Sequence, residues 1–157
     1  MLYPAGTPTQ PEIIAIALSK LDLRSCDVLA DIGCGSGSIS IQAAGLVKQV
    51  YAIDNRDEAI NATTTNLKEC RITNVSVLQG EASRILSDLD IDCAFLGGSK
   101  NLEVVLGLLM KKTKRFVISA VRVEMVSFTV ELLKTPVTPL ITLIRNKQGL
   151  QCGVLKL

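Results

Sequence analysis

Along this chain, short apolar runs alternate with longer segments whose apolar residues recur at every third or fourth position. The short runs predict buried β-strands, and the longer segments predict amphipathic α-helices. Strands are predicted at Val28–Ile32, Val50–Ile53, Val75–Leu78, Cys93–Leu96, Arg115–Ala120, Thr138–Arg145 and Leu150–Lys156. Helices are predicted from Thr9 to Leu21 and at Ser38–Leu46, Asp57–Cys70, Ala82–Leu89, Leu102–Lys111 and Val123–Lys134.

The order of these elements predicts the fold class. Strands that alternate with helices form a parallel sheet covered on both faces, with right-handed crossovers. The sequence Asn146-Lys-Gln-Gly149 between the last two strands has hairpin chemistry, so one strand there runs antiparallel. We therefore predict an α/β protein with a doubly wound, mostly parallel seven-stranded sheet and an antiparallel C-terminal strand. Ligands of such sheets bind at the carboxyl ends of the strands.

The first helix has a start signal of its own. In Thr9-Gln-Pro-Glu12, the threonine and the glutamate have the spacing of a capping box. Pro11 loses no hydrogen bond in the first turn of a helix. We expect the helix to start at Thr9, with the side chain of Thr9 as its cap.

The most informative segment comes directly after the first predicted strand. Asp31 precedes three glycines, Gly33, Gly35 and Gly37, and a predicted helix begins directly after them. A strand, a glycine turn and a helix in this order bring bare backbone close to a ligand at a helix N-terminus. In the dinucleotide fingerprint, Gly-x-Gly-x-x-Gly, the third glycine comes one residue later than here. The carboxylate before the first glycine suits a cationic or hydroxyl-rich ligand better than a pyrophosphate.

Polar or small residues come after the next strands, at the edge where a ligand is expected. Asp54 ends the second strand, where its carboxylate can accept ribose hydroxyls or, alternatively, cap the next helix. Glu81 and Ala82 come after the third strand, where their backbone can contact an adenine edge or only form the first turn of a helix. Gly97 and Gly98 leave room near the reactive end of a ligand, or simply make a flexible loop. In this order along the chain, these positions favour a nucleoside ligand.

Composition narrows the possible chemistry. We expect the 157 residues to form one domain, residues 1–157. A net charge of +2 and an aromatic content of 3% disfavour a nucleic-acid partner. No segment approaches the roughly 20 consecutive apolar residues of a membrane span, and the N-terminus does not resemble a signal peptide. Histidine is absent, which removes the most common general base and metal ligand, so we expect no metal site.

The cysteines and the apolar content indicate the surroundings of the protein. Cys34 lies in the glycine turn, where we expect it to fill a small space. An apolar fraction of 48% and a mean hydropathy of +0.36 are high for a small protein, so we expect a homo-oligomer that covers part of this surface. No Cys-x-x-Cys pair occurs, which favours reduced thiols in a cytoplasmic protein; the cysteines are Cys26, Cys34, Cys70, Cys93 and Cys152.

The glycine turn with its preceding acid, Asp-x-Gly-x-Gly-x-Gly, resembles motif I of the class I S-adenosylmethionine-dependent methyltransferases, which have a Rossmann-like fold. A second resemblance is carried by five segments: Thr7-Pro-Thr9-x-x-Glu12, Ile32–Ser38, Val50–Asp54, Gly80–Ala82 and Phe95–Ser99. With these segments, the chain from about Pro4 to about Leu155 resembles the precorrin C15-methyltransferases, the decarboxylating enzymes of cobalamin biosynthesis. A departure from that family is Gly149-Leu-Gln-Cys152, where members usually have Gly-x-His/Thr-Met.

The resemblance implies a function and a set of cofactor-binding residues. It implies methyl transfer from S-adenosylmethionine to carbon 15 of a precorrin or cobalt-precorrin, with loss of carbon dioxide from the ring-C acetate. It also implies a homotetramer. The residues implied to bind the cofactor are Thr9, the turn residues Gly33, Cys34, Gly35, Ser36 and Gly37, then Asp54 and Ala82, and beside Ala82 we include Glu81.

The chemistry implied by this resemblance needs little from the protein. The acceptor carbon of a partly reduced tetrapyrrole is already nucleophilic, so alignment with the sulfonium methyl is the main requirement, and the sequence identifies no catalytic residue. Basic residues should hold the substrate carboxylates; the candidates are Lys100, Arg122 and Arg145, each of which is otherwise a solvated surface charge. Three other functions stay open: an NAD-dependent oxidoreductase, a methyltransferase for another small molecule, and a non-catalytic cofactor-binding subunit.

Overall fold

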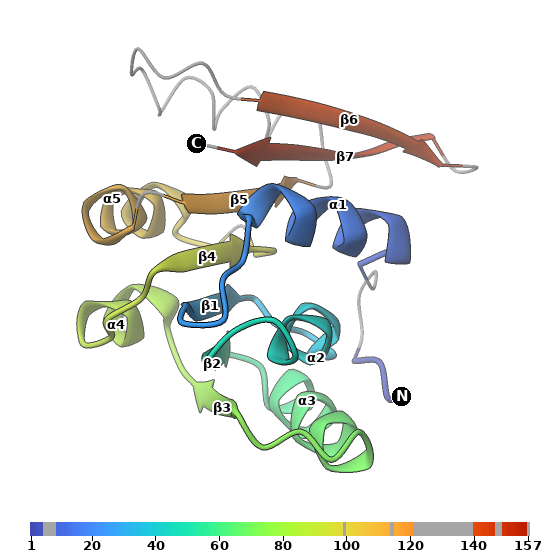
Figure 1. Ribbon diagram of the computed structural model, residues 1–157, viewed down its shortest axis with the longest axis vertical. Helices are drawn as coiled ribbons and strands as arrows, with labels where there is room; N and C mark the ends of the chain where they lie inside the picture. Colours follow the sequence, from blue (N-terminus) through green and yellow to red (C-terminus); the bar gives the residue numbers. More distant parts are fainter. Residues whose placement is uncertain (5–8, 99, 114, 121–139, 147–148, 157) are drawn as a thin grey trace.

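The computed structural model describes residues 1–4, 9–98, 100–113, 115–120, 140–146 and 149–156 (Figure 1). Within this part of the chain, five helices alternate with the first five strands of a seven-stranded sheet. The helices are α1 (Pro11–Leu21), α2 (Ser38–Ala44), α3 (Asp57–Glu69), α4 (Ala82–Ser87) and α5 (Leu102–Lys112). The strands are β1 (Val28–Ile32), β2 (Gln49–Asp54), β3 (Val75–Gln79), β4 (Cys93–Leu96), β5 (Arg115–Ala120), β6 (Leu140–Asn146) and β7 (Gly149–Lys156).

The strands lie in the order β3-β2-β1-β4-β5-β7-β6. Neighbours among β1 to β5 pair in parallel, whereas β7 runs antiparallel to both β5 and β6. The predicted fold class, a mostly parallel seven-stranded sheet with an antiparallel C-terminal strand, is therefore confirmed. The order brings β1 next to β4, although two strands separate them in the sequence, and such a switch point is where ligands bind in doubly wound sheets.

Each face of the sheet has its own hydrophobic core. Helices α4 and α5 cover one face, and α1, α2 and α3 cover the other (Figure 1). Alternate residues of a strand point to opposite faces, so that Ala30 and Ile32 of β1 pack under α4 and α5, while Leu29 packs under α1 and α2. Phe95 of β4 is 1% exposed in the second of these cores. Burial on both faces explains why the parallel strands read as continuous apolar runs.

The boundaries of most elements agree with the predictions. Strands β1, β4 and β5 begin and end at the predicted residues, and the other elements from α2 to β7 differ by at most two residues at either end. The predicted helix at Val123–Lys134 lies outside the described residues. None of the described helices is long and apolar enough to cross a membrane.

The predicted start of the first helix was wrong. Helix α1 begins at Pro11 with Gln10 as its N-cap, and no side chain caps it. Gln10 has extended backbone angles, φ −66° and ψ 148°. A residue directly before proline is disfavoured in the helical region, so Gln10 cannot be the first helical residue, as a cap at Thr9 would require. Pro11 at the first helical position was predicted correctly.

Candidate cofactor and active site

A glycine turn, residues 33–37, joins β1 to α2. Its glycines Gly33, Gly35 and Gly37 have φ angles of +76°, +58° and +77°, in the left-handed region that glycine adopts without strain. A Cβ atom on Gly33 would lie 2.8 Å from the backbone nitrogen of Gly98, in the loop after β4. Glycine is therefore required at position 33 both by the turn and by the close approach of that loop.

Three amide groups of this turn donate hydrogen bonds to β2. Gly33 and Cys34 both donate to the carbonyl oxygen of Ile53, at 2.8 and 3.0 Å. Gly35 donates to Oδ2 of Asp54 at 3.1 Å. These bonds fasten the turn to the end of β2. At Gly33 and Gly35, the turn thus offers a ligand backbone without side chains, rather than free amides.

Asp31 of β1 is a buried carboxylate that is only half satisfied. Asp31 is 1% exposed, and its Oδ2 accepts hydrogen bonds from the amide and the hydroxyl of Ser40, at 3.1 and 2.6 Å. Within the described part of the chain, no group donates to its buried Oδ1. Burial raises the pKa of Asp31 to about 6, although the Ser40 bonds oppose this shift. A buried acceptor without a donor costs free energy, which a cationic ligand group would offset.

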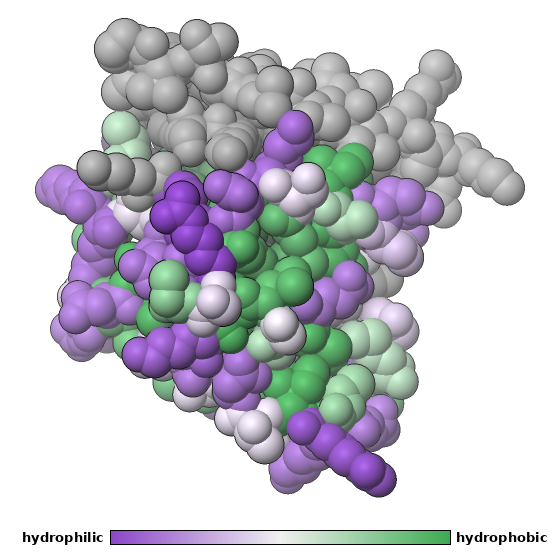
Figure 2. Space-filling view, in the orientation of Figure 1, coloured by the Kyte–Doolittle hydropathy of each residue, from purple (hydrophilic) through white to green (hydrophobic). Residues whose placement is uncertain are grey.

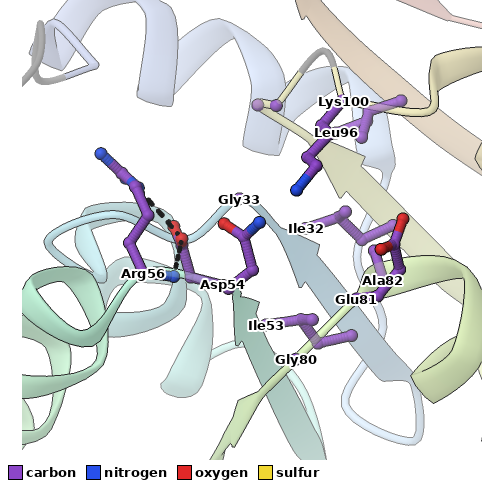
Figure 3. A pocket seen from close by; sticks show the side chains of 13 residues that line it. Ile32, Gly33, Ile53, Asp54, Arg56, Gly80, Glu81, Ala82, Leu96 and Lys100 are labelled. Atoms are coloured by element: carbon purple, nitrogen blue, oxygen red, sulfur yellow. Dashed lines mark hydrogen bonds and ion pairs between the residues drawn. The ribbon is translucent and has the colours of Figure 1, made fainter.

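Asp54 at the end of β2 is in the opposite situation. Its Oδ1 accepts hydrogen bonds from the backbone nitrogen and Nε of Arg56, and its Oδ2 accepts from Gly35 and from Nη2 of Arg56, all at 3.1 Å (Figure 3). Burial alone would raise the pKa of Asp54, but the bonds from Arg56 and Gly35 outweigh it and hold the pKa below its usual value. Asp54 is therefore ionised at neutral pH.

A cavity of about 370 Å³ opens at the carboxyl ends of the first four strands (Figure 3). Each strand contributes a residue at or just beyond its carboxyl end: Gly33 after β1, Asp54 at the end of β2, Glu81 after β3 and Gly97 after β4. Lys100, in the segment between β4 and α5, directs its ammonium group into this cavity. The cavity therefore has carboxylates toward β2 and β3 and a cation toward β4.

A second cavity, of about 180 Å³, adjoins the first. Asp31 and Thr9 line it, together with Cys34 and Ser36 of the glycine turn. Three residues, Gly33, Arg56 and Gly97, line both cavities, so the two meet at the turn. An elongated ligand with a hydroxyl-rich part in the first cavity and a cationic part in the second would match the two carboxylates.

The sequence profile of the precorrin methyltransferase domain matches residues 3–149 of the chain. This protein belongs to the precorrin methyltransferase family. A probable cobalt-precorrin-6B C(15)-methyltransferase (decarboxylating) of Methanosarcina acetivorans is 50% identical over 137 residues, which cover 83% of this chain and 74% of that protein. The chain thus spans about three quarters of the length of this relative.

Two solved structures have the same fold as this precorrin methyltransferase. The precorrin 8W decarboxylase of Methanobacterium thermoautotrophicum superposes with a TM-score of 0.80 at 28% identity, covering 98% of this chain and 91% of that one. The precorrin-6y C5,15-methyltransferase of Geobacter metallireducens superposes with a TM-score of 0.86 at 27% identity, covering 99% and 90%.

The residues predicted from the sequence lie in two groups in the precorrin methyltransferase structure. Gly37 lines neither cavity; a Cβ there would lie 2.9 Å from Cγ2 of Thr63, so this glycine serves the packing of α3 against the turn. Burial raises the pKa of the Cys34 thiol to about 12, so this side chain fills space and stays protonated. The first cavity brings together Gly33, Asp54, Glu81 and Ala82, and the second brings together Thr9, Gly33, Cys34, Gly35 and Ser36.

Two residues of this site were not among the cofactor-binding residues predicted from the sequence. The carboxylate of Asp31 was predicted, from its position before the first glycine, to suit a cationic or hydroxyl-rich ligand, but Asp31 was not counted among those residues. Arg56 was not considered, because only the folded chain shows that its side chain turns back onto Asp54.

Of the candidates for substrate carboxylates, Lys100 lines the first cavity, whereas Arg122 and the side chain of Arg145 lie outside the described part. The residues described include no group of three His, Cys, Asp or Glu side chains suited to a metal ion.

Proposed function

We propose that this chain transfers a methyl group from S-adenosylmethionine to carbon 15 of a precorrin or cobalt-precorrin, with loss of carbon dioxide from the ring-C acetate. Family membership and the 50% identity to a probable cobalt-precorrin-6B C(15)-methyltransferase (decarboxylating) support this proposal. The observation that carries it is the pair of cavities that meet at the glycine turn, with Asp54 in one and the half-satisfied Asp31 in the other.

The residues present fit S-adenosylmethionine. The Oδ1 of Asp31, to which none of the described residues donates, suits the ammonium group of the methionine part, and Thr9 lies in the same cavity. Asp54 suits the ribose hydroxyls, and the backbone at Glu81 and Ala82 suits the adenine edge. When bound, this cofactor supplies an electrophilic methyl group on a sulfonium.

The role of the protein in methyl transfer is then mainly positioning. Gly33 and Gly97 present no side chain at the junction of the two cavities, so the acceptor carbon can approach closely there. Holding two reactants in line contributes on the order of 7–11 kcal/mol in favourable systems, which suits a chain that contains no histidine. A nearby cation also favours the ionised form of Asp31, which then holds that cation in place.

Lys100 is the residue we propose for a carboxylate of the acceptor. It directs its ammonium group into the first cavity from the segment after β4 (Figure 3). Its neighbours in that cavity already have partners, since Asp54 accepts from Arg56 and Glu81 accepts from Asn101. The described residues give the Lys100 ammonium no ion pair, so its charge is available to an anionic substrate.

The proposal is tested in two steps. A ligand at a concentration of a hundred times its Kd stabilises a protein by about 2.7 kcal/mol. At that concentration, S-adenosylhomocysteine should raise the Tm by roughly 5–10 °C, while NAD should leave the Tm unchanged. With S-adenosylmethionine and enzymatically prepared cobalt-precorrin-6B, mass spectrometry should find a product with one added methyl group and one carboxyl group fewer. Stabilisation by NAD indicates a dehydrogenase, stabilisation without transfer indicates a cofactor-binding subunit, and methylation without carbon dioxide loss indicates another methyltransferase. Each of these outcomes contradicts the proposal.

We further propose that the protein is a cytoplasmic homotetramer. Apolar side chains form a continuous area bordered by hydrophilic ones on the face seen in Figure 2. Cys26, Cys34, Cys70 and Cys93 are free thiols, as expected in a reducing compartment. Light scattering at micromolar concentration tests the assembly, and a monomer would contradict it. The exposed large apolar residues in the described part include Met1, Leu2, Tyr3, Leu46, Val104 and Met110.

A further inference from the structure

Four hydrogen bonds converge on the Asp54 carboxylate. Two come from backbone nitrogens, those of Gly35 and Arg56, and two come from Nε and Nη2 of the Arg56 side chain, all at 3.1 Å. A carboxylate has about four acceptor positions. Every acceptor position of the residue proposed to bind the ribose is therefore in use.

The backbone and side-chain donors differ in how easily they can leave Asp54. The amide of Gly35 is fixed in the glycine turn, and the amide of Arg56 is fixed at the start of α3, where Ala59 and Ile60 donate to the Arg56 carbonyl, each at 3.1 Å. The Arg56 side chain, in contrast, is 42% exposed, so it can rotate into water without disturbing the core. Only the guanidinium can be exchanged while the fold is kept.

The guanidinium also lies where a ligand has to pass. Arg56 lines both cavities, as Gly33 and Gly97 do, so it lies at their junction. Its Nη2 lies 4.0 Å from the position that a Cβ of Gly35 would take, which places the head of the side chain over the glycine turn. A ligand with its base in the first cavity and its amino-acid end in the second has its ribose at this junction.

We infer that the Arg56 guanidinium holds the two acceptor positions on Asp54 that the ribose hydroxyls take when the cofactor binds. This inference rests on the proposed function, because it requires a ligand with a ribose diol. Two O–H donors replace two N–H donors on the same carboxylate, so the hydrogen-bond count of Asp54 is unchanged. Arg56 is thus a positioning residue: it keeps Asp54 oriented in the ligand-free protein. It also weakens binding of cofactor and demethylated product alike, which favours product release.

Calorimetric titration with S-adenosylhomocysteine tests this exchange. A partly exposed ion pair contributes about 0.2–1 kcal/mol, so Arg56→Ala should bind S-adenosylhomocysteine up to about fivefold more tightly than the wild-type protein. Arg84→Ala is the matched control, because Arg84 is an exposed arginine of α4 that lines neither cavity, and its affinity should not change. If Arg56 stays on Asp54 and only orients it, Arg56→Ala should bind more weakly, which would overturn the inference.

A second ligand separates exchange from a general loosening of the site. For each protein, the Kd of 2′,3′-dideoxy-S-adenosylhomocysteine is divided by the Kd of S-adenosylhomocysteine. The exchange predicts that this ratio is larger in Arg56→Ala than in the wild type, by the same factor of up to about five, because the diol no longer displaces a partner. Equal ratios overturn the inference while leaving the proposed function intact. Failure of the wild-type protein to bind S-adenosylhomocysteine overturns both.

Discussion

Replacing Gly33 by alanine should damage both the fold and the cofactor site, whereas the same change at Gly35 should have only a small effect on the fold. Both glycines have positive φ angles, +76° and +58°. The space around them differs: a Cβ on Gly33 would lie 2.8 Å from the nitrogen and 3.1 Å from the Cα of Gly98, while the nearest atoms of the described residues would lie 4.0 Å from a Cβ on Gly35. In the measurement of stability, Gly35→Ala is therefore a control for backbone strain alone.

The expected magnitudes combine backbone strain with steric overlap. The left-handed conformation costs alanine about 1 kcal/mol at either position. Overlap with the backbone of Gly98 adds about 1–3 kcal/mol at Gly33, because a backbone, unlike the end of a side chain, cannot rotate away. For a chain of this size, 1 kcal/mol lowers the Tm by about 2–4 °C, so we expect a loss of roughly 4–16 °C for Gly33→Ala and roughly 2–4 °C for Gly35→Ala.

Circular dichroism during heating of the ligand-free proteins measures the difference in stability. Calorimetry with S-adenosylhomocysteine gives a second measurement, because Gly33→Ala can relieve the overlap only by moving the loop after β4, which lines the first cavity. We expect its affinity to fall about tenfold or more. Equal losses of Tm in the two variants would refute the argument from close approach.

Three further substitutions test the site. Burial raises the pKa of Asp31 from 3.8 to about 6, so between these pH values the native protein retains a proton that the unfolded chain has lost. The free energy of unfolding should therefore fall as the pH rises from about 4 to about 6. Asp31→Asn should remove this pH dependence, measured by urea titrations, and should weaken S-adenosylmethionine binding above about pH 6. Asp54→Ala should lower the affinity for S-adenosylhomocysteine, measured by calorimetry, by about tenfold or more. Lys100→Ala should raise the KM for the acceptor in steady-state assays and leave S-adenosylhomocysteine binding unchanged. The control Lys111→Ala, at an exposed position of α5, should change neither quantity. An unchanged KM in Lys100→Ala would show that Lys100 does not bind the acceptor.

The strands and the glycine turn could be predicted because their causes are local. The apolar run Cys93–Leu96 has to be buried on both faces, and its ends are set by the polar and glycine residues beside it. The spacing of the three glycines likewise matches three positive φ angles. The wrong start of α1 also had a local cause: Pro11 restricts the residue before it, and this restriction outweighs the capping-box spacing.

The rest of the site depends on contacts between segments far apart in the sequence. The approach of Gly98 to Gly33 arises because β1 and β4 are neighbours in the sheet, which the sequence shows only through the fold class. The half-satisfied state of Asp31 depends on which groups α2 brings near it, and Ser40 reaches only one of its oxygens. The motif could locate these residues but could not give their hydrogen-bond partners.

The contrast between the two carboxylates explains why this site favours one class of nucleoside over another. The Asp54 carboxylate is ionised and already accepts four hydrogen bonds, so neutral hydroxyls can replace some of its present donors. Asp31, in contrast, has a buried oxygen to which none of the described residues donates. A ligand that brings a positive charge to Asp31 satisfies that oxygen and stabilises the ionised carboxylate. A dinucleotide would instead bring a pyrophosphate to the same turn. The negative charges of the pyrophosphate and of the buried carboxylate would repel each other, and a low effective dielectric strengthens this repulsion. We therefore expect the turn to select against NAD by charge as well as by the spacing of its glycines.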